Sequence, residues 1–220
     1  MWYMLLGVLI AYLLGSISFA VWIGRIFYRT DVRQHGSGNA GTTNTIRVLG
    51  WMPGLMVLLL DAFKGWLAIH VGDGLMPEAY AEWQEYYDVL LAVSVLLGHI
   101  FPLFTGFKGG KGVATMVGII LALYPEAFLG ALAVFMLVFL LTHYVSLASI
   151  LAAVTFPLLD VFIFHQEHGV LIVFSVLVPV LIIVTHRKNI KRLLKGEESK
   201  MYIWKKASDG KATSDDQGCR

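Results

Sequence analysis

The chain has 220 residues, of which 57% are hydrophobic and 15% are charged, and its mean hydropathy is +0.71. A soluble domain of this length carries a larger share of charged side chains, so the composition excludes an ordinary soluble enzyme. The formal net charge of +2 gives no reason to expect a nucleic-acid partner. The single cysteine, Cys219, excludes an intramolecular disulfide and a cysteine-based metal site. The sequence therefore predicts an all-α, polytopic integral membrane protein embedded in a lipid bilayer.

Seven apolar segments approach the ~20 residues that an α-helix needs to cross a bilayer. The first begins MWYMLLGVLI, with no basic residue before its apolar run, which is typical of a retained span rather than a cleaved signal peptide. The fourth is short for a full crossing, so the alternative for it is a partly re-entrant segment. The expected spans are 3–24, 52–71, 88–104, 112–124, 126–142, 147–164 and 169–185.

All but one of the Lys and Arg residues lie on a single side of these spans. Sixteen of the 17 Lys and Arg residues lie in the connections of one side, and the connections of the other side hold none. By the positive-inside rule the basic side is cytoplasmic. This places the N-terminus outside and the C-terminus in the cytoplasm, which requires an odd number of spans and agrees with seven transmembrane helices. The basic segments are 25–51, 105–111, 143–146 and 186–220, and the opposite ones are 72–87, Pro125 with Glu126, and 165–168.

Residues 1–204 are expected to form a single membrane domain. Residues 205–220 form a polar tail that is predicted to be disordered, because its Lys, Ser, Asp and Gly residues cannot build a core. Just before the tail, residues 186–195 alternate basic and apolar side chains. This pattern predicts an amphipathic helix on the inner leaflet, where anionic lipid would attract it.

The first basic connection contains GSGNAGTTN (36–44), followed by Arg47. Its glycines and small polar side chains leave many hydrogen-bond donors and little bulk, and an arginine can contact a phosphate with two parallel hydrogen bonds. The alternative is an ordinary polar turn, because the same residue types dominate turns. The ligand-binding candidates here are Gly36, Ser37, Gly38, Asn39, Thr42, Asn44 and Arg47.

The second basic connection belongs to GHIFPLFTGFKGGKGVAT (98–115), in which Lys108 and Lys111 are flanked by glycines. Glycine lets backbone approach a ligand closely and lysine supplies positive charge, so the segment predicts an anion pocket at the membrane surface. It fails the nucleotide-binding pattern G-x-x-x-x-G-K-[ST], because the spacing is one residue short and Gly112 follows the lysine. The alternative is two lysines that anchor a span. The candidate glycines are Gly109, Gly110 and Gly112.

The third and fourth basic connections contribute weaker signals. Ser146 lies at a short helix-to-helix turn, although serines often pack between membrane helices for structural reasons. His186 and Asn189 are three residues apart and share one face if the segment is helical. A lone interfacial histidine is more often structural, and Glu197 and Glu198 are expected to be solvated charges at a helix end.

Asp61 and Lys64 lie inside the second expected span. An ionisable pair within a membrane is costly and is a functional hypothesis by default. The preferred interpretation is a structural pair at i, i+3 with Lys64 oriented toward the polar pocket. Asp160, deep in the sixth span, has no assigned partner.

Several catalytic patterns are missing from the sequence. No histidine is followed by aspartate five positions later, as in the common glycerolipid acyltransferases, and there is no G-x-S-x-G nucleophile elbow. No histidine and carboxylate cluster has metal-ligand spacing. The cytoplasmic segments therefore offer groups that hold a ligand and no evident protein nucleophile, and neither a metal nor another cofactor is expected.

Four motifs together resemble one family. They are GSISFAVWIGR (15–25), GSGNAGTTN with Arg47, GHIFPLFTGFKGGKGVAT, and THRKNIKRLLKGEE (185–198). In this order they resemble the bacterial acyl-phosphate-dependent glycerol-3-phosphate acyltransferases, the PlsY family, from the first span to about Glu198. The resemblance implies a seven-span enzyme of the bacterial inner membrane with a cytoplasmic active site. It also implies acyl phosphate and glycerol 3-phosphate as substrates, lysophosphatidic acid and phosphate as products, and no required cofactor or protein partner.

The residue chemistry agrees with this implication, because two phosphate-bearing substrates need two neighbouring anion sites. Acyl phosphate is already activated, so positioning and charge stabilisation can replace a protein nucleophile. The hypothesis is direct attack by the glycerol hydroxyl, with a substrate phosphate taking the proton. A transporter of a phosphorylated metabolite is the alternative. The expected catalytic residues are Ser37, Arg47, Lys108, His186 and Asn189. The expected substrate-binding residues are Gly36, Gly38, Asn39, Thr42, Asn44, Lys64, Gly109, Gly110, Lys111, Gly112 and Ser146.

Overall fold

The computed structural model describes residues 2–202, and the expected disordered tail, residues 205–220, lies outside them. Within the described residues the chain is helical, with no strand. The α-helices are α1 (Trp2–Ser16), α2 (Phe19–Tyr28), α3 (Thr42–Leu49), α4 (Trp51–Asp73), α5 (Gln84–Ile100), α6 (Val113–Leu123), α7 (Pro125–Thr142), α8 (Val145–Leu158), α9 (Gly169–Thr185) and α10 (Arg187–Leu194).

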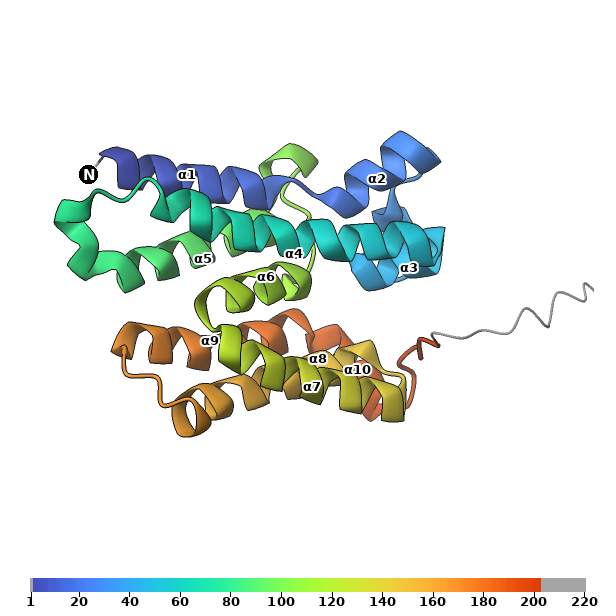
Figure 1. Ribbon diagram of the computed structural model, residues 1–220. Coiled ribbons are helices and arrows are strands. Elements are labelled where there is room, and N and C mark those ends of the chain that lie inside the picture. The colour runs from blue at the N-terminus through green and yellow to red at the C-terminus, as the bar shows by residue number, and fades with distance from the viewer. Residues whose placement is uncertain (1, 203–220) are drawn as a thin grey trace, which may run out of the picture.

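The helices form two groups with α6 between them (Figure 1). One group contains α1 to α5 and the other contains α7 to α10. Glycines let helices of the first group and α6 touch backbone to backbone: a Cβ on Gly98 would lie 2.2 Å from the Tyr12 carbonyl oxygen, and one on Gly118 would lie 1.8 Å from that of Ala62. Such contacts are typical of helix packing in membranes, where small residues allow close approach. The membrane fold thus depends on glycines in the spans as well as on those in the loops.

Length and composition qualify four helices as membrane crossings, and up to six if each bent pair counts as one span. Each of the seven expected segments contains an α-helix, and α9 matches its expected limits. The fourth, α6, has only 11 residues, which corresponds to about 17 Å and is shorter than the ~30 Å hydrocarbon core. The all-helical membrane architecture is therefore confirmed, while α6 is too short for a full crossing by itself.

Two of the helix pairs are sharply bent. The axes of α1 and α2 differ by 44° across Ile17 and Ser18, and those of α9 and α10 differ by 65° at His186. A third irregularity follows Pro157 of α8, where residues Leu159–Ile163 form a π-helical turn that buries Asp160. Proline cannot donate the helical hydrogen bond, so a change of helical pitch at this point has a local cause.

The polar motifs gather at one end of the molecule. Helices α2, α3 and α10 lie at that end, whereas the N-terminus and the α4–α5 and α8–α9 connections lie at the other (Figure 1). The first end carries the basic segments and the second carries acidic ones. The separation of charge expected from the sequence is therefore a separation in space.

Candidate active site

The first basic loop is folded around the side chain of Asn44, at the start of α3. The Asn44 amide donates to the carbonyls of Val32 (2.7 Å) and His35 (3.1 Å), and its oxygen accepts from the Ser37 backbone N–H (2.7 Å). Gly36 and Gly38 have φ angles of +61° and +73°, which favour glycine. Asn44 is 1% exposed, so its amide shapes the loop from within. The buried Asn39 Oδ1 and Thr42 Oγ1 have no hydrogen-bond partner in the part of the chain described.

Arg33 joins this loop to the second basic loop, a role that the sequence did not suggest. Its guanidinium donates to the carbonyls of Thr105 (2.7 Å) and Lys108 (3.2 Å) and also to the carboxylate of Asp31. The hydrogen bonds from Arg33 are the main cause that lowers the pKa of Asp31 below its ordinary value. Because Arg33 crosslinks the loops through main-chain atoms, they form a single structural unit.

The second basic loop lies directly on the end of α5. The N–H groups of Gly109 and Gly110 donate to the carbonyls of Ile100 and His99, both at 3.2 Å. These two amides therefore hold the loop to α5. The sequence had suggested that they face a ligand, but their hydrogen bonds are made within the protein. Lys108 is exposed and lines a polar cavity of about 450 Å³ with Arg33, Gly38, Thr105 and Gly109 among others.

A compact cluster forms where the second loop meets α8, α10 and the segment after α10. The Lys111 ammonium donates to the Asn189 amide oxygen, and the Asn189 nitrogen donates to Glu198 at 2.7 Å. Glu198 also accepts from Ser146 (2.9 Å) and Arg192 (2.6 Å). The expectation that Glu198 is a solvated charge is wrong, because it is 7% exposed and joins three segments.

The cluster has an excess of positive charge. Burial lowers the pKa of Arg47, the nearby charges of Glu198 and Arg192 act on it in opposite directions, and its guanidinium is 3.5 Å from the Ser199 carbonyl. Burial lowers the pKa of Lys111 to about 8, so it is still mainly protonated at neutral pH. Three cations, Arg47, Lys111 and Arg192, and one carboxylate leave a formal charge of +2. A doubly charged phosphate would balance it.

His186 adds a neutral acceptor to this cluster. Burial and the charge of Lys111 lower its pKa to about 4. Its Nδ1 lies 2.8 Å from the Ile182 carbonyl, which can only accept, so Nδ1 is assigned the proton. The other ring nitrogen then carries a lone pair at neutral pH.

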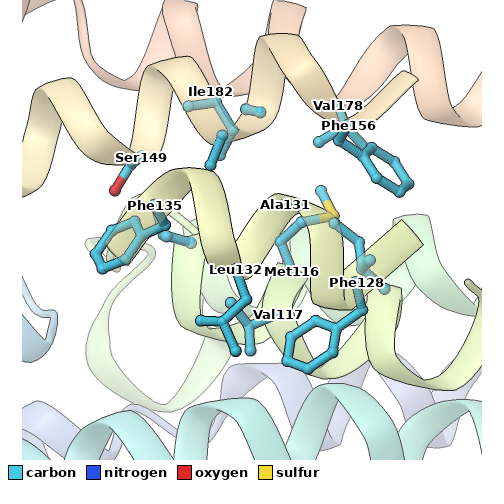
Figure 2. Close-up of a pocket in the computed structure, with 14 residues that line it drawn as sticks. Met116, Val117, Phe128, Ala131, Leu132, Phe135, Ser149, Phe156, Val178 and Ile182 are labelled. Carbon is cyan, nitrogen blue, oxygen red and sulfur yellow. The ribbon is translucent and has the colours of Figure 1, made fainter. Parts of the chain in front are cut away.

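An apolar cavity of about 80 Å³ lies between α6, α7, α8 and α9. It reaches Val113, two residues beyond Lys111. Ser149 and Phe135 lie at one end of the cavity and Phe128 and Phe156 at the other (Figure 2). Ser149 is one helical turn from Ser146 on α8, so the Ser149 end is the one nearer the charged cluster.

The structure brings together five of the expected site residues in the cluster, from four segments of the chain. Others line the polar cavity or shape the loops around it, and Gly112 starts α6 with a φ of +84°. Lys64 is different: it is buried, pairs with Asp61 at 2.7 Å and donates to the Ile17 carbonyl. The expected pair is present, but Lys64 lines neither the polar nor the apolar cavity, and its predicted part in substrate binding stays a prediction. The five residues of the cluster are Arg47, Lys111, Ser146, His186 and Asn189.

Sequence reasoning missed Arg33, Arg192 and Glu198. Charged residues are common in basic loops, and only the folded chain shows that these three are held by other segments. Within residues 2–202, no three His, Cys, Asp or Glu side chains are grouped as metal ligands.

If Lys111 balances the charge of a substrate, the rate of catalysis should fall about tenfold per pH unit above about pH 8, because the deprotonated side chain is neutral. The pKa of folded Lys111 is below its ordinary value of 10.5. Between pH 8 and 10.5 the unfolded chain binds more protons at Lys111 than the folded chain does. Rising pH therefore favours folding through Lys111, and the loss of activity is not caused by unfolding through this group. Initial rates of wild type and Lys111→Arg between pH 6.5 and 9.5 test this. A basic limb that stays near pH 8 in Lys111→Arg would contradict the assignment.

The fold is that of an integral membrane protein, and its candidate site combines a positively charged cluster with an apolar cavity. The family model described as glycerol-3-phosphate acyltransferase matches residues 5–196. The glycerol-3-phosphate acyltransferase of Enterococcus faecalis is 42% identical over 200 residues, covering 88% of this chain and 89% of the relative. Glycerol-3-phosphate acyltransferase 2 of Bacillus anthracis is 42% identical over 197 residues, covering 90% and 98%.

Solved structures give the same result. The crystal structure of PlsY, an integral membrane glycerol 3-phosphate acyltransferase, in its glycerol 3-phosphate form has a TM-score of 0.81 and 36% identity, covering 90% of this chain and 96% of that one. Its lysophosphatidic acid form has a TM-score of 0.78 and 35% identity, covering 90% and 95%. The chain belongs to the glycerol-3-phosphate acyltransferase family and is a membrane acyltransferase. Membership in an enzyme family decides against the transporter alternative.

Proposed function

We propose that this chain transfers a fatty acyl group from acyl phosphate to the 1-hydroxyl of sn-glycerol 3-phosphate, giving lysophosphatidic acid and phosphate in the first step of phospholipid biosynthesis. One observation carries the proposal. The positively charged cluster of Arg47, Lys111, Arg192 and Glu198 is linked to one end of an apolar cavity through α8, where Ser146 donates to Glu198 and Ser149, one helical turn on, lines the cavity. An acyl phosphate has the same arrangement of an anionic head on an apolar chain.

The reaction is a direct transfer between the two substrates. The glycerol hydroxyl oxygen forms a bond to the acyl carbonyl carbon, and the bond from that carbon to the phosphate oxygen breaks, with its electron pair leaving on phosphate. The hydroxyl proton moves to a phosphate oxygen. This route suits the site because a phosphate monoester has a second pKa of about 6, whereas the pKa of His186 is about 4. Phosphate is therefore the stronger base.

The basic groups divide into two neighbouring sets, as two phosphate-bearing substrates require. Lys108 lines the polar cavity between the basic loops, and Lys111 and Arg47 belong to the cluster. Preorganised cations of this kind stabilise the charge that develops on the acyl oxygen and the leaving phosphate. His186 and Asn189 close the pocket. Ser37 keeps its proposed catalytic role, with its hydroxyl held by Asn44 Oδ1 at 3.1 Å. The remaining proposed substrate-binding or loop-shaping residues are Gly36, Gly38, Asn39, Thr42, Asn44, Gly109, Gly110, Gly112 and Ser146.

The proposed setting is a bacterial inner membrane that the chain crosses seven times, with the N-terminus outside and the site in the cytoplasm. The gathering of basic segments at one end of the molecule supports this orientation. The single Cys219 offers a direct test. A membrane-impermeant maleimide should label Cys219 in inverted inner-membrane vesicles. It should not label Cys219 in cells whose outer membrane alone is permeabilised. The reverse pattern would overturn the orientation.

The acyl donor is tested with purified protein in detergent and glycerol 3-phosphate. Palmitoyl phosphate should yield lysophosphatidic acid and equimolar phosphate, whereas palmitoyl-CoA and palmitoyl-acyl carrier protein should yield neither. Turnover with the thioesters and none with palmitoyl phosphate would show that the donor proposal is wrong.

Filling the apolar cavity is expected to change chain-length preference. Ala131→Phe places a ring between Phe128 and Phe135 (Figure 2). If the new ring displaces two or three methylene groups of the acyl chain, about 2 kcal/mol of binding free energy is lost, and kcat/KM for palmitoyl phosphate falls about thirtyfold. Decanoyl phosphate should stay within about threefold, and the exposed Leu137→Phe on the same helix is the control. Equal losses with both donors would contradict an acyl site here.

A further inference from the structure

A separate set of buried ionisable side chains lies beneath the second basic loop. Lys64 pairs with Asp61 at 2.7 Å and donates to the Ile17 carbonyl at 2.8 Å, at the break between α1 and α2. His99, near the end of α5, has its Nδ1 3.7 Å from Asp61 Oδ1 and 3.1 Å from Thr115 Oγ1. The four side chains of this buried network, Asp61, Lys64, His99 and Thr115, are each at most 6% exposed.

Charge neutralisation alone does not account for this network. Asp61 and Lys64 are three residues apart on one helix and already compensate each other. A buried pair of this kind can often be replaced by apolar residues of similar volume without loss of stability. His99 and Thr115, which come from two other helices, extend the network beyond the pair and bring it to the loop.

His99 is the point of contact with the loop. Its backbone carbonyl accepts a hydrogen bond from the Gly110 N–H at 3.2 Å. A Cβ atom placed on Gly110 would lie 2.3 Å from the His99 Nε2 atom. The carbonyl oxygen of Ala40, from the first basic loop, would lie 2.8 Å from the same Cβ. The imidazole therefore packs between the buried network on one side and the loop backbone on the other.

We propose that His99 is a positioning residue for the acyl transfer. Thr115 holds its ring by a hydrogen bond and Asp61 lies beside it, and the ring fixes the path of Gly110 and thereby the directions of Lys108 and Lys111. Lys111 follows Gly110 immediately and reaches Asn189 in the cluster. A misplacement of about 1 Å can cost ~10²-fold in rate, so a support for this backbone has a kinetic consequence. The inference rests on the proposed role of the two lysines in holding substrate phosphates.

A steric double-mutant cycle tests the contact between the ring and the loop. Gly110→Ala forces a methyl group toward the His99 ring and is expected to lower kcat with palmitoyl phosphate about a hundredfold, and His99→Ala about tenfold. Because His99→Ala removes the ring that the methyl group meets, the double variant should be no slower than Gly110→Ala alone. Losses that multiply to about a thousandfold would show that the two sites act independently and would overturn the inference.

A second pair of variants separates positioning from folding. His99→Gln and the double variant Asp61→Leu/Lys64→Met should melt within a few degrees of wild type in detergent, yet lose about tenfold in kcat and raise KM for glycerol 3-phosphate. If the network only stabilised the fold, melting temperature would fall while kcat per folded molecule stayed at the wild-type value. Wild-type protein without turnover on palmitoyl phosphate would instead show that the donor proposal has failed.

Discussion

Lys108→Met is expected to lower kcat/KM for glycerol 3-phosphate by about a hundredfold to a thousandfold with little change in melting temperature. Lys108 is exposed at the polar cavity, and its side chain has no ion pair or hydrogen bond within residues 2–202, so its charge is available to a ligand. Losing one preorganised cation that stabilises transition-state charge costs roughly 3 to 4 kcal/mol. Arg47→Ala should have a loss of the same order, because it removes a cation of the neighbouring cluster.

Steady-state kinetics with palmitoyl phosphate measure the effect. Lys108→Arg keeps the charge and should retain more activity than Lys108→Met. Lys188→Met removes an exposed cation of α10 that lies outside the two basic loops, and it controls for the general surface charge. If Lys108→Met and Arg47→Ala both turned over within a few-fold of wild type, the assignment of these cations to the substrate phosphates would be wrong.

Glu198→Gln is expected to destabilise the protein and to reduce the activity of the molecules that remain folded. Burial opposes ionisation of Glu198, but hydrogen bonds from Arg192, Asn189 and Ser146 outweigh it and lower the pKa below the ordinary 4.5. Glutamine would leave the Arg192 guanidinium without an anionic partner. We expect a loss of about 2 to 3 kcal/mol, or about 5–10 °C in melting temperature.

The activity of folded Glu198→Gln should fall at least tenfold, because Glu198 orients Asn189 and, through it, Lys111. Thermal melting in detergent and kcat per folded molecule are the two measurements. Glu197→Gln is a matched control, since the neighbouring carboxylate is exposed. Equal changes in melting temperature and kcat for the two substitutions would show that the contacts of Glu198 contribute no more to stability or activity than an exposed carboxylate does. The contribution of Glu198 ionisation is present above pH 4.5 and is lost as pH falls through its lower folded value.

The sequence was a good guide to the membrane helices because apolar length and charge asymmetry are local properties. The limits of α7 and α9 follow from long, mainly apolar runs. The bend at Ile17 was not predicted, because the carbonyl that it exposes is satisfied by Lys64 from another helix. Local patterns do not report such a partner.

The candidate site shows the same division. Glycines, Arg47 and the two lysines were identified because their types and spacing suit anions. Glu198 was misjudged because it follows an exposed residue and a helix end, which ordinarily means solvent. Its burial arises from three donors on α8 and α10, separated from it by 6 to 52 residues.

The sequence by itself therefore determined the membrane class, the basic side, the residue types proposed to bind anions and, through four ordered motifs, the family resemblance. These are properties of composition and short spacing. Only the tertiary structure decided that the amides of Gly109 and Gly110 hold their own loop, that Arg33 joins the two loops, and that Glu198 organises the cations. The physical reason is that a buried charge or amide must find its partners in space, and the fold supplied them from distant segments.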